Sequence, residues 1–177
     1  MSDAATTTAS ANPAPKKFYG KYRGLVIENI DPMQIGRIIA QVPDVLGLVP
    51  SSWAMPCVPF AGIQSGAFMV PPIGSQVWME FEQGNPDYPI WTGGFWGVVA
   101  EVPVLATAPP AIPPGGNVVI QTPLQSTIVL SDSVPTPLTG GIILKSGASL
   151  MVINATGIYM TAPIVAINET ALLVLGP

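Results

Sequence analysis

The C-terminal part of the chain, residues 102–177, is rich in aliphatic and β-branched residues but carries only three charged side chains. These are Asp132, Lys145 and Glu169. Gly, Ser, Asn and Pro divide the apolar sequence into segments far shorter than the roughly 20 residues of a membrane-spanning helix. A folded chain in water does not leave so much apolar surface exposed. We therefore expect this region to pack against another surface, and a second copy of the same chain is the simplest one.

The composition favours an all-β fold. Hydrophobic residues make up 49% of the 177 residues and charged residues only 9%, against about 25% charged in typical domains. The 21 prolines and 18 glycines interrupt the chain throughout, and no window shows sustained apolar spacing at a helical period. Short strands separated by many turns are the expected result.

The first folded block is predicted to span residues 18–97. A clear strand lies at residues 74–82, where Val77, Met79 and Phe81 alternate with polar or outward-facing residues. Residues 60–72 are predicted to form a loop. Five short strands in a block of this size favour a small Greek-key barrel of the OB type. The expected strands are residues 21–29, 36–43, 52–58, 74–82 and 90–97.

Two further segments frame this block. Residues 1–17 are predicted to be a disordered N-terminal arm, because they are polar and lack aromatic residues up to Phe18. Residues 98–116 are a Pro-rich connector, in which the prolines favour an extended polyproline II spacer.

Residues 117–177 are predicted to form a C-terminal β-helix spike. Short strands are expected at residues 118–121, 127–131, 142–145, 150–154, 158–161, 165–168 and 172–175, and the later ones recur at a short, nearly regular spacing. Period-2 alternation suggests that four apolar pairs share one face. One chain alone would leave strand edges and this face open, so we predict an intertwined homotrimer. Its predicted core consists of Ile142, Leu144, Leu150, Val152, Ile158, Met160, Val165 and Ile167.

The sequence argues against an enzyme. It contains no histidine, which excludes Ser-His-Asp and Cys-His catalysis and histidine metal sites. Cys57, the one cysteine, lies between prolines and is predicted to be a buried structural residue. A single cysteine is consistent with a protein that is made in a reducing cytoplasm. Glu80 and Glu82 are predicted to face solvent from one strand rather than act as a glycosidase pair. No catalytic residue, cofactor or metal site is predicted, and a lysozyme-like lysin remains only as an alternative.

Nucleic-acid binding is also disfavoured. The chain has six basic residues and a net charge of −4, too little positive charge to neutralise a phosphate backbone. The four tryptophans are predicted to lie in the barrel core or at a subunit interface rather than to stack on bases. An OB-fold module that binds single-stranded nucleic acid or a peptide is kept as the alternative function. The basic cluster of Lys16, Lys17, Lys21 and Arg23 either holds an acidic partner or forms a solvated arm.

Four motifs occur in a characteristic order. They read Gly-Arg-Ile-Ile-Ala-Gln-Val-Pro at residues 36–43, Trp-Ala-Met-Pro-Cys-Val at 53–58, Pro-Pro-Ile-Gly-Ser-Gln-Val-Trp-Met-Glu-Phe-Glu at 71–82, and Gly-Asn-Pro-Asp-Tyr-Pro-Ile-Trp-Thr-Gly-Gly-Phe-Trp at 84–96. This order resembles the OB-fold of phage baseplate assembly protein V and of the valine-glycine repeat spikes of type VI secretion. Asn85 stands where that family usually has Asp. The C-terminal repeats are similar to the triple-stranded β-helix of those spikes.

The resemblance implies a structural spike: a homotrimer that sits on a baseplate hub and makes transient contact with the target membrane during contraction. The chain departs from that family in two features. No lysozyme-like insert lies between the barrel and the β-helix, because only the Pro-rich connector joins them. No hub domain precedes the barrel, so the hub is expected to be a separate protein. Assembly would take place in the bacterial cytoplasm, and the mature protein would belong to a phage tail, an extracellular injection particle or a type VI relative. The His-x-His iron site of some phage spikes is excluded, because the chain has no histidine.

The apolar C-terminal end is predicted to form the tip. A PAAR-like tip protein would dock on it, or the end would close on itself as an apolar plug. The predicted docking residues are Leu172, Leu173, Val174, Leu175, Gly176 and Pro177.

Overall fold

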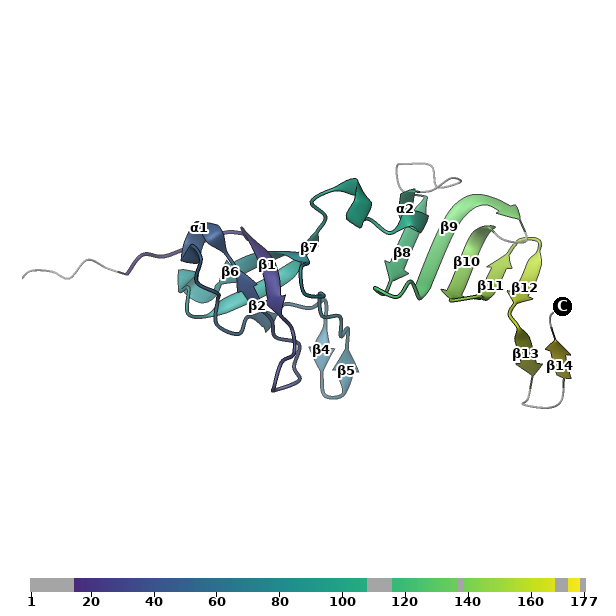
Figure 1. Ribbon diagram of the computed structural model, residues 1–177, viewed down its shortest axis with the longest axis horizontal. Helices are drawn as coiled ribbons and strands as arrows, with labels where there is room; N and C mark the ends of the chain where they lie inside the picture. The colour runs from purple at the N-terminus through teal and green to yellow at the C-terminus, as the bar shows by residue number, and fades with distance from the viewer. Residues whose placement is uncertain (1–14, 108–115, 137–138, 168–171, 176–177) are drawn as a thin grey trace, which may run out of the picture. The chain divides into compact units, whose positions relative to one another are not determined.

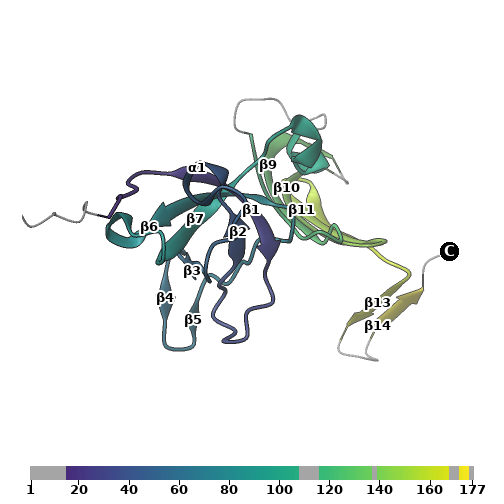
Figure 2. The same ribbon diagram turned by 60° about the vertical axis from the view of Figure 1, so that its left-hand side comes forward.

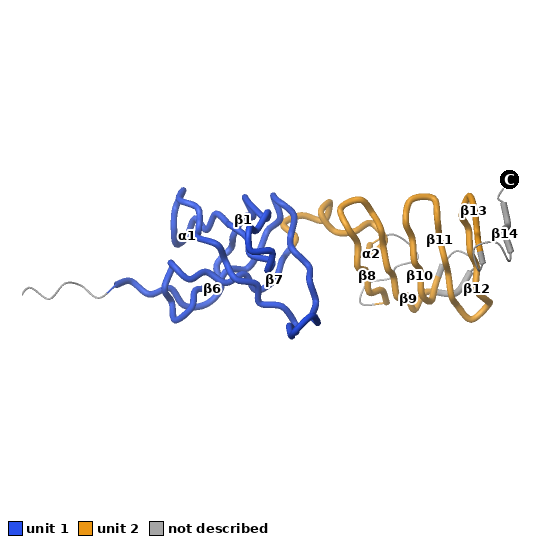
Figure 3. Tube along the Cα trace, turned by 90° about the horizontal axis from the view of Figure 1, so that it is seen from below, with its two compact units in different colours: residues 1–95 blue, residues 96–177 orange. Residues whose placement is uncertain are grey.

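The computed structural model describes residues 15–107, 116–136, 139–167 and 172–175. The chain divides into two compact units, residues 1–95 and 96–177 (Figure 3). Most of the predicted N-terminal arm lies outside the described residues, as do Gly176 and Pro177 at the predicted tip.

The N-terminal unit is built on a curled five-stranded sheet with the order β2-β1-β6-β7-β3 (Figure 2). All its pairs are antiparallel except the short parallel pair of β3 with β7. These five strands correspond to the five that the sequence predicts. Their bounds are β1 Tyr22–Glu28, β2 Ile39–Gln41, β3 Met55–Pro56, β6 Gln76–Phe81 and β7 Pro89–Phe95.

Backbone hydrogen bonds close this sheet into a barrel. Next to edge strand β2, Ile38 and Ala54 exchange hydrogen bonds of 3.2 and 2.7 Å. Ser51 donates to Ala40 at 2.9 Å in the same region. The segment that leads into β3 therefore joins β2 on one side, while β3 itself pairs with β7 on the other. Closing both edges satisfies backbone groups that an open sheet would leave unpaired.

The barrel interior is apolar and tightly packed. Along β6, Val77, Met79 and Phe81 are buried, as their alternation predicts. Gly24 on β1 lies against them, and a Cβ at this position would come within 2.7 Å of the Met79 side chain. The strand can therefore approach its neighbour closely because residue 24 is glycine. The rest of the core comprises Val26, Ile38, Ala40, Val42, Ala54 and Trp91.

Two segments differ from the sequence-based expectation. Within the predicted loop 60–72 the chain forms a small hairpin of β4 (Ala61–Gly62) and β5 (Ser65–Gly66). The predicted polyproline connector instead contains a 3-10 turn, η2 (Val99–Glu101), and a short helix, α2 (Val104–Thr107), in its described part. The bonds of Glu101 to Val98 and of Ala106 to Pro103 close these turns. Two more short helices, α1 (Pro43–Leu46) and η1 (Glu82–Gly84), lie in the N-terminal unit.

The C-terminal unit contains a five-stranded antiparallel meander with the order β12-β11-β10-β9-β8, followed by a hairpin of β13 and β14 (Figure 1). All seven predicted strands are present, which confirms the all-β fold class. In the single chain they form antiparallel sheets. Their bounds are β8 Asn117–Gln121, β9 Thr127–Thr136, β10 Thr139–Ser146, β11 Ser149–Asn154, β12 Gly157–Thr161, β13 Ile164–Ile167 and β14 Leu172–Leu175.

Within the part of the chain that the structure describes, no helix has the length and apolarity that crossing a membrane requires.

Candidate functional site

One face of the β8–β12 sheet is formed by apolar side chains from all five strands. Residues that pair directly across antiparallel strands lie on the same face, so the strand registers define two continuous rows. The first row is Val118, Leu130, Ile142, Ile153 and Ile158, and the second is Ile120, Ile128, Leu144, Met151 and Met160. We call these ten residues the apolar sheet face.

The apolar sheet face is open to solvent in the single chain. Even on the central strand β10, Ile142 and Leu144 are each 41% exposed, and Ile158 on edge strand β12 is 63% exposed. Ile153 and Met151 are half-buried. A contiguous apolar patch of this kind marks an interaction surface in a folded protein.

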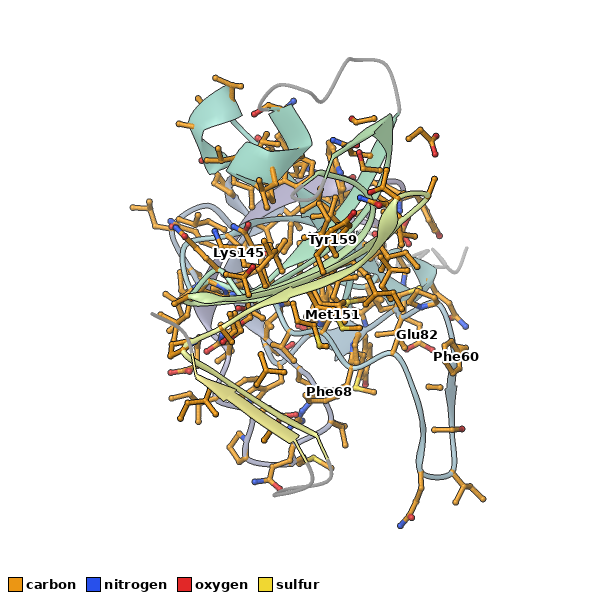
Figure 4. The ribbon with its side chains drawn as sticks, turned by 90° about the vertical axis from the view of Figure 1, so that its right-hand side faces the viewer. Phe60, Phe68, Glu82, Lys145, Met151 and Tyr159 are labelled. Carbon is orange, nitrogen blue, oxygen red and sulfur yellow. The ribbon has the colours of Figure 1, made fainter. Side chains whose placement is uncertain are left out.

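The opposite face of the same sheet is different. It carries a row of Val119, Val129, Ile143, Val152 and Tyr159, in which Val129 and Val152 are buried. Figure 4 shows Met151 on one side of the sheet and Lys145 with Tyr159 on the other. The sheet therefore has one face with its own small core and one face without a cover.

The registers divide the predicted trimer-core residues between the two faces of the sheet. Ile142, Leu144, Ile158 and Met160 lie on the apolar sheet face, but Leu150 and Val152 lie on the opposite face, paired with Lys145 and Ile143. The expectation that all four pairs share one face is therefore wrong. The reason is the two-residue turn at Gly147 and Ala148, between the paired residues Ser146 and Ser149. A two-residue turn pairs even-numbered residues of one strand with odd-numbered residues of the next. The even-numbered Ile142 and Leu144 of β10 therefore share their face with the odd-numbered Met151 and Ile153 of β11.

The last two strands form a separate small sheet. Val165 and Ile167 of the predicted core lie on β13, which pairs with β14. Four of the predicted tip residues, Leu172–Leu175, are the whole of β14. The structure thus brings four of the eight predicted core residues together. Sequence reasoning missed six members of the face: Val118, Ile120, Ile128, Leu130, Met151 and Ile153.

A second organised feature is the loop between β1 and β2, which is held by the carboxylate of Asp31. Arg37 donates from Nε and Nη2 to Oδ1 at 3.0 and 2.6 Å. The backbone N–H of Met33 donates to the same oxygen, and those of Ile35 and Arg37 donate to Oδ2. The Arg37 side chain holds the pKa of Asp31 well below its usual range; burial opposes this effect, and the three N–H groups add to it.

Replacing Asp31 with Asn should lower the melting temperature of the N-terminal unit at pH 7. An amide cannot accept the charge-assisted bonds of Arg37 and presents N–H groups to backbone donors. The depressed folded pKa means that the ionised carboxylate stabilises the fold above the unfolded pKa of about 3.9. This contribution disappears as the pH falls through the folded pKa, so the two melting curves should converge in acid.

Thermal melts of both proteins from neutral to acidic pH would test this expectation. Asp87→Asn serves as the matched control, because Asp87 is an exposed carboxylate of the same unit. Equal melting temperatures for Asp31→Asn and wild type at pH 7 would contradict the role of the loop.

The residues considered for chemistry do not form a catalytic arrangement. Glu80 forms an ion pair with Lys21 at 2.7 Å. Glu82 begins the turn η1, so the two glutamates do not share a strand as predicted. Cys57 is exposed rather than buried; its N–H donates to Trp91 O at the barrel edge, while its side chain remains outside. Within the described ranges, no group of three or more His, Cys, Asp or Glu residues comes together.

Several aromatic and basic residues contact one another or the backbone within the N-terminal unit. Trp91 lies in the core, as predicted, and donates from Nε1 to Gly36 O at 3.0 Å. Trp96, by contrast, is 62% exposed. The Arg23 guanidinium lies over the rings of Trp78 and Phe95, at 5.8 and 5.4 Å from their centroids. Trp53 is half-buried, with the Arg37 guanidinium over its ring.

Comparison with protein families accounts for both units. Residues 22–96 match the type VI secretion system/phage-baseplate injector OB domain, and residues 117–173 match the phage baseplate V C-terminal trimerisation domain. No curated protein gives a significant match to the chain. The first match covers the closed barrel, and the second places the apolar sheet face in a domain that forms trimers. The chain belongs to the phage baseplate V and type VI secretion spike family, as a homotrimeric structural protein of a phage tail or injection particle.

Proposed function

We propose that this protein is the central spike of a contractile injection machine, attached to a baseplate hub and driven through the target envelope when the sheath contracts. The observation that carries the proposal is the apolar sheet face, which lies in a trimerisation domain that follows an injector OB domain. The role is mechanical, and the protein catalyses no reaction.

Three chains would bury the apolar sheet faces against one another. Fully burying an aliphatic side chain contributes about 1.5–3 kcal/mol, so ten half-exposed side chains supply on the order of 10 kcal/mol per chain before the costs of association. Strands β8 and β12 stand at the two ends of the sheet. In a ring of three, the β12 edge of one chain can pair with the β8 edge of the next, which closes all edges. Such a closed, dry prism is suited to resist unfolding under load.

The two ends of the spike have separate roles in this proposal. The OB barrels attach to the hub. Strand β14, Leu172–Leu175, with Gly176 and Pro177 after it, either carries a PAAR-like tip protein or closes the point. Its uncharged, aliphatic sequence supports an apolar contact there. Assembly takes place in the bacterial cytoplasm, before contraction brings the spike into transient contact with the target membrane.

The mass of the purified protein in solution is the first test. Size-exclusion chromatography with light scattering should give about 55 kDa, three times the chain mass of 18.4 kDa. A monodisperse monomer would overturn the proposal.

The second test uses particles. Those complemented with the wild-type chain should show density at the centre of the baseplate and should penetrate target cells. Particles without the chain should fail to do so, and normal penetration by them would contradict the spike role.

A further inference from the structure

The N-terminal unit contains a long stretch of sequence without charged side chains. No Asp, Glu, Lys or Arg occurs between Asp44 and Glu80. This stretch includes the β4–β5 hairpin, which extends away from the five-stranded sheet (Figures 1 and 2). At its tip, Ile63 is 99% exposed.

An apolar groove of about 790 Å³ lies beside the hairpin. Its walls come from the β1–β2 loop at Ile35, from Met55 on β3, and from Phe60, Phe68 and Val70 around the hairpin. Figure 4 labels Phe60 and Phe68. The volume lies within the range of about 300–1,000 Å³ that holds a drug-sized ligand, so the groove has room for several side chains.

The β4–β5 hairpin is very short. It has two paired positions, Ala61 with Gly66 and Gly62 with Ser65, and an isolated two-stranded hairpin is only marginally stable in water. Ala61, Gly62 and Gln64 form part of the groove wall. Ile63 is almost fully exposed and is not among the residues that line the groove, so its side chain does not fill the groove of its own chain.

We propose that the hairpin of each chain inserts Ile63 into the apolar groove of the neighbouring chain within the trimer. A knob and a hole on different parts of one surface make a heterologous contact, and three such contacts close into a ring. The trimerisation domain holds three OB barrels together, which raises their local concentration and favours a contact that is weak between free units. This inference rests on the trimer that underlies the proposed function.

Charge supports a second copy as the occupant. The N-terminal unit, residues 1–95, has seven acidic and five basic side chains, a net charge of −2, so like-charged barrels repel one another unless they meet through neutral surface. The hairpin and the groove supply such a surface on both sides of the contact, because the hairpin lies in the uncharged stretch and every residue that lines the groove, including Ile35 and Trp91 outside that stretch, is uncharged.

Disulfide cross-linking tests the contact. The triple variant Cys57→Ser, Ile35→Cys, Ile63→Cys places one thiol in the groove and one at the hairpin tip. Mild oxidation of the full-length trimer should produce mainly covalent trimers on a non-reducing gel. The control Cys57→Ser, Ile35→Cys, Leu48→Cys moves the second thiol to another exposed site, since Leu48 is 88% exposed, and should give mainly uncross-linked chains.

A second readout does not depend on thiol geometry. Ile63→Asp should leave the protein trimeric by light scattering but increase hydrogen exchange at least several-fold across residues 60–70. Leu48→Asp should leave exchange in this segment unchanged.

The outcomes separate this inference from the proposed function. A trimer that gives only uncross-linked or internally linked chains, with unchanged exchange in Ile63→Asp, would overturn the hairpin contact and leave the spike intact. Cross-links from whole particles that join the hairpin to a different protein would overturn it as well. A monomer in light scattering would instead defeat the proposed spike itself.

Discussion

Leu144→Asp should convert the trimer into separate chains. Leu144 lies on the central strand β10, in the second row of the apolar sheet face, and pairs with Ile128 and Met151. In the trimer an Asp at this position would be a buried carboxylate without a partner. An uncompensated buried charge costs about 3–5 kcal/mol, and three-fold symmetry introduces it three times. The penalty is on the order of 10 kcal/mol per trimer and adds to the lost burial of three leucine side chains, so we expect it to outweigh the net free energy that remains after the costs of association.

Light scattering at a fixed chain concentration would measure this loss. Thr161→Asp is the matched control: it adds the same charge to edge strand β12, but Thr161 pairs with Leu150 and so lies on the opposite face. Thr161 is exposed in the single chain, and its variant should remain trimeric. If both variants dissociate, or neither does, the apolar sheet face is not the trimer interface.

Lowering the pH tests whether the buried negative charge is the cause of the dissociation. A protonated carboxyl costs much less to bury than a carboxylate. Leu144→Asp should therefore regain part of its trimer population as the pH falls toward 4, whereas Leu144→Asn should show no such recovery.

The difference between predicted and observed faces shows which features the sequence encodes locally. Alternation within a single strand depends only on the pleat, and so Val77, Met79 and Phe81 were assigned correctly to the core. Relating one strand to the next requires the turn length and register as well. The two-residue turn at Gly147 and Ala148 sets the register of β11 so that Met151 and Ile153, rather than the predicted Leu150 and Val152, lie on the apolar sheet face.

Contacts made through loops were harder to predict. Asp31 followed by Pro32 is a turn signal, but the return of Arg37 to the Asp31 carboxylate depends on the path of the whole loop. Cys57 has the hydrophobic character of a buried residue. It is exposed because β3 joins the barrel through a very short parallel pair, and the side chain of Cys57 lies outside the barrel.

Gly141→Ala should strongly destabilise the C-terminal unit. Gly141 lies on β10, where the register with β9 shifts, and has φ of +81°. A Cβ at this position would collide with the backbone carbonyl oxygen of Ile153 on β11. Alanine pays about 1–2 kcal/mol for the left-handed conformation and about 1–3 kcal/mol for overpacking. The expected loss is therefore roughly 2–5 kcal/mol.

Gly147→Ala separates these two costs. Gly147 also has a positive φ, of +56°, but a Cβ there meets open space. This variant should lose only the conformational part, about 1–2 kcal/mol. Denaturant unfolding of both full-length variants at one chain concentration would measure the difference, because the stability of an oligomer depends on concentration. Equal losses would show that β10 and β11 can separate to accept a methyl group. A larger loss at Gly141 would show that the close approach of these strands maintains the register on which both rows of the apolar sheet face depend.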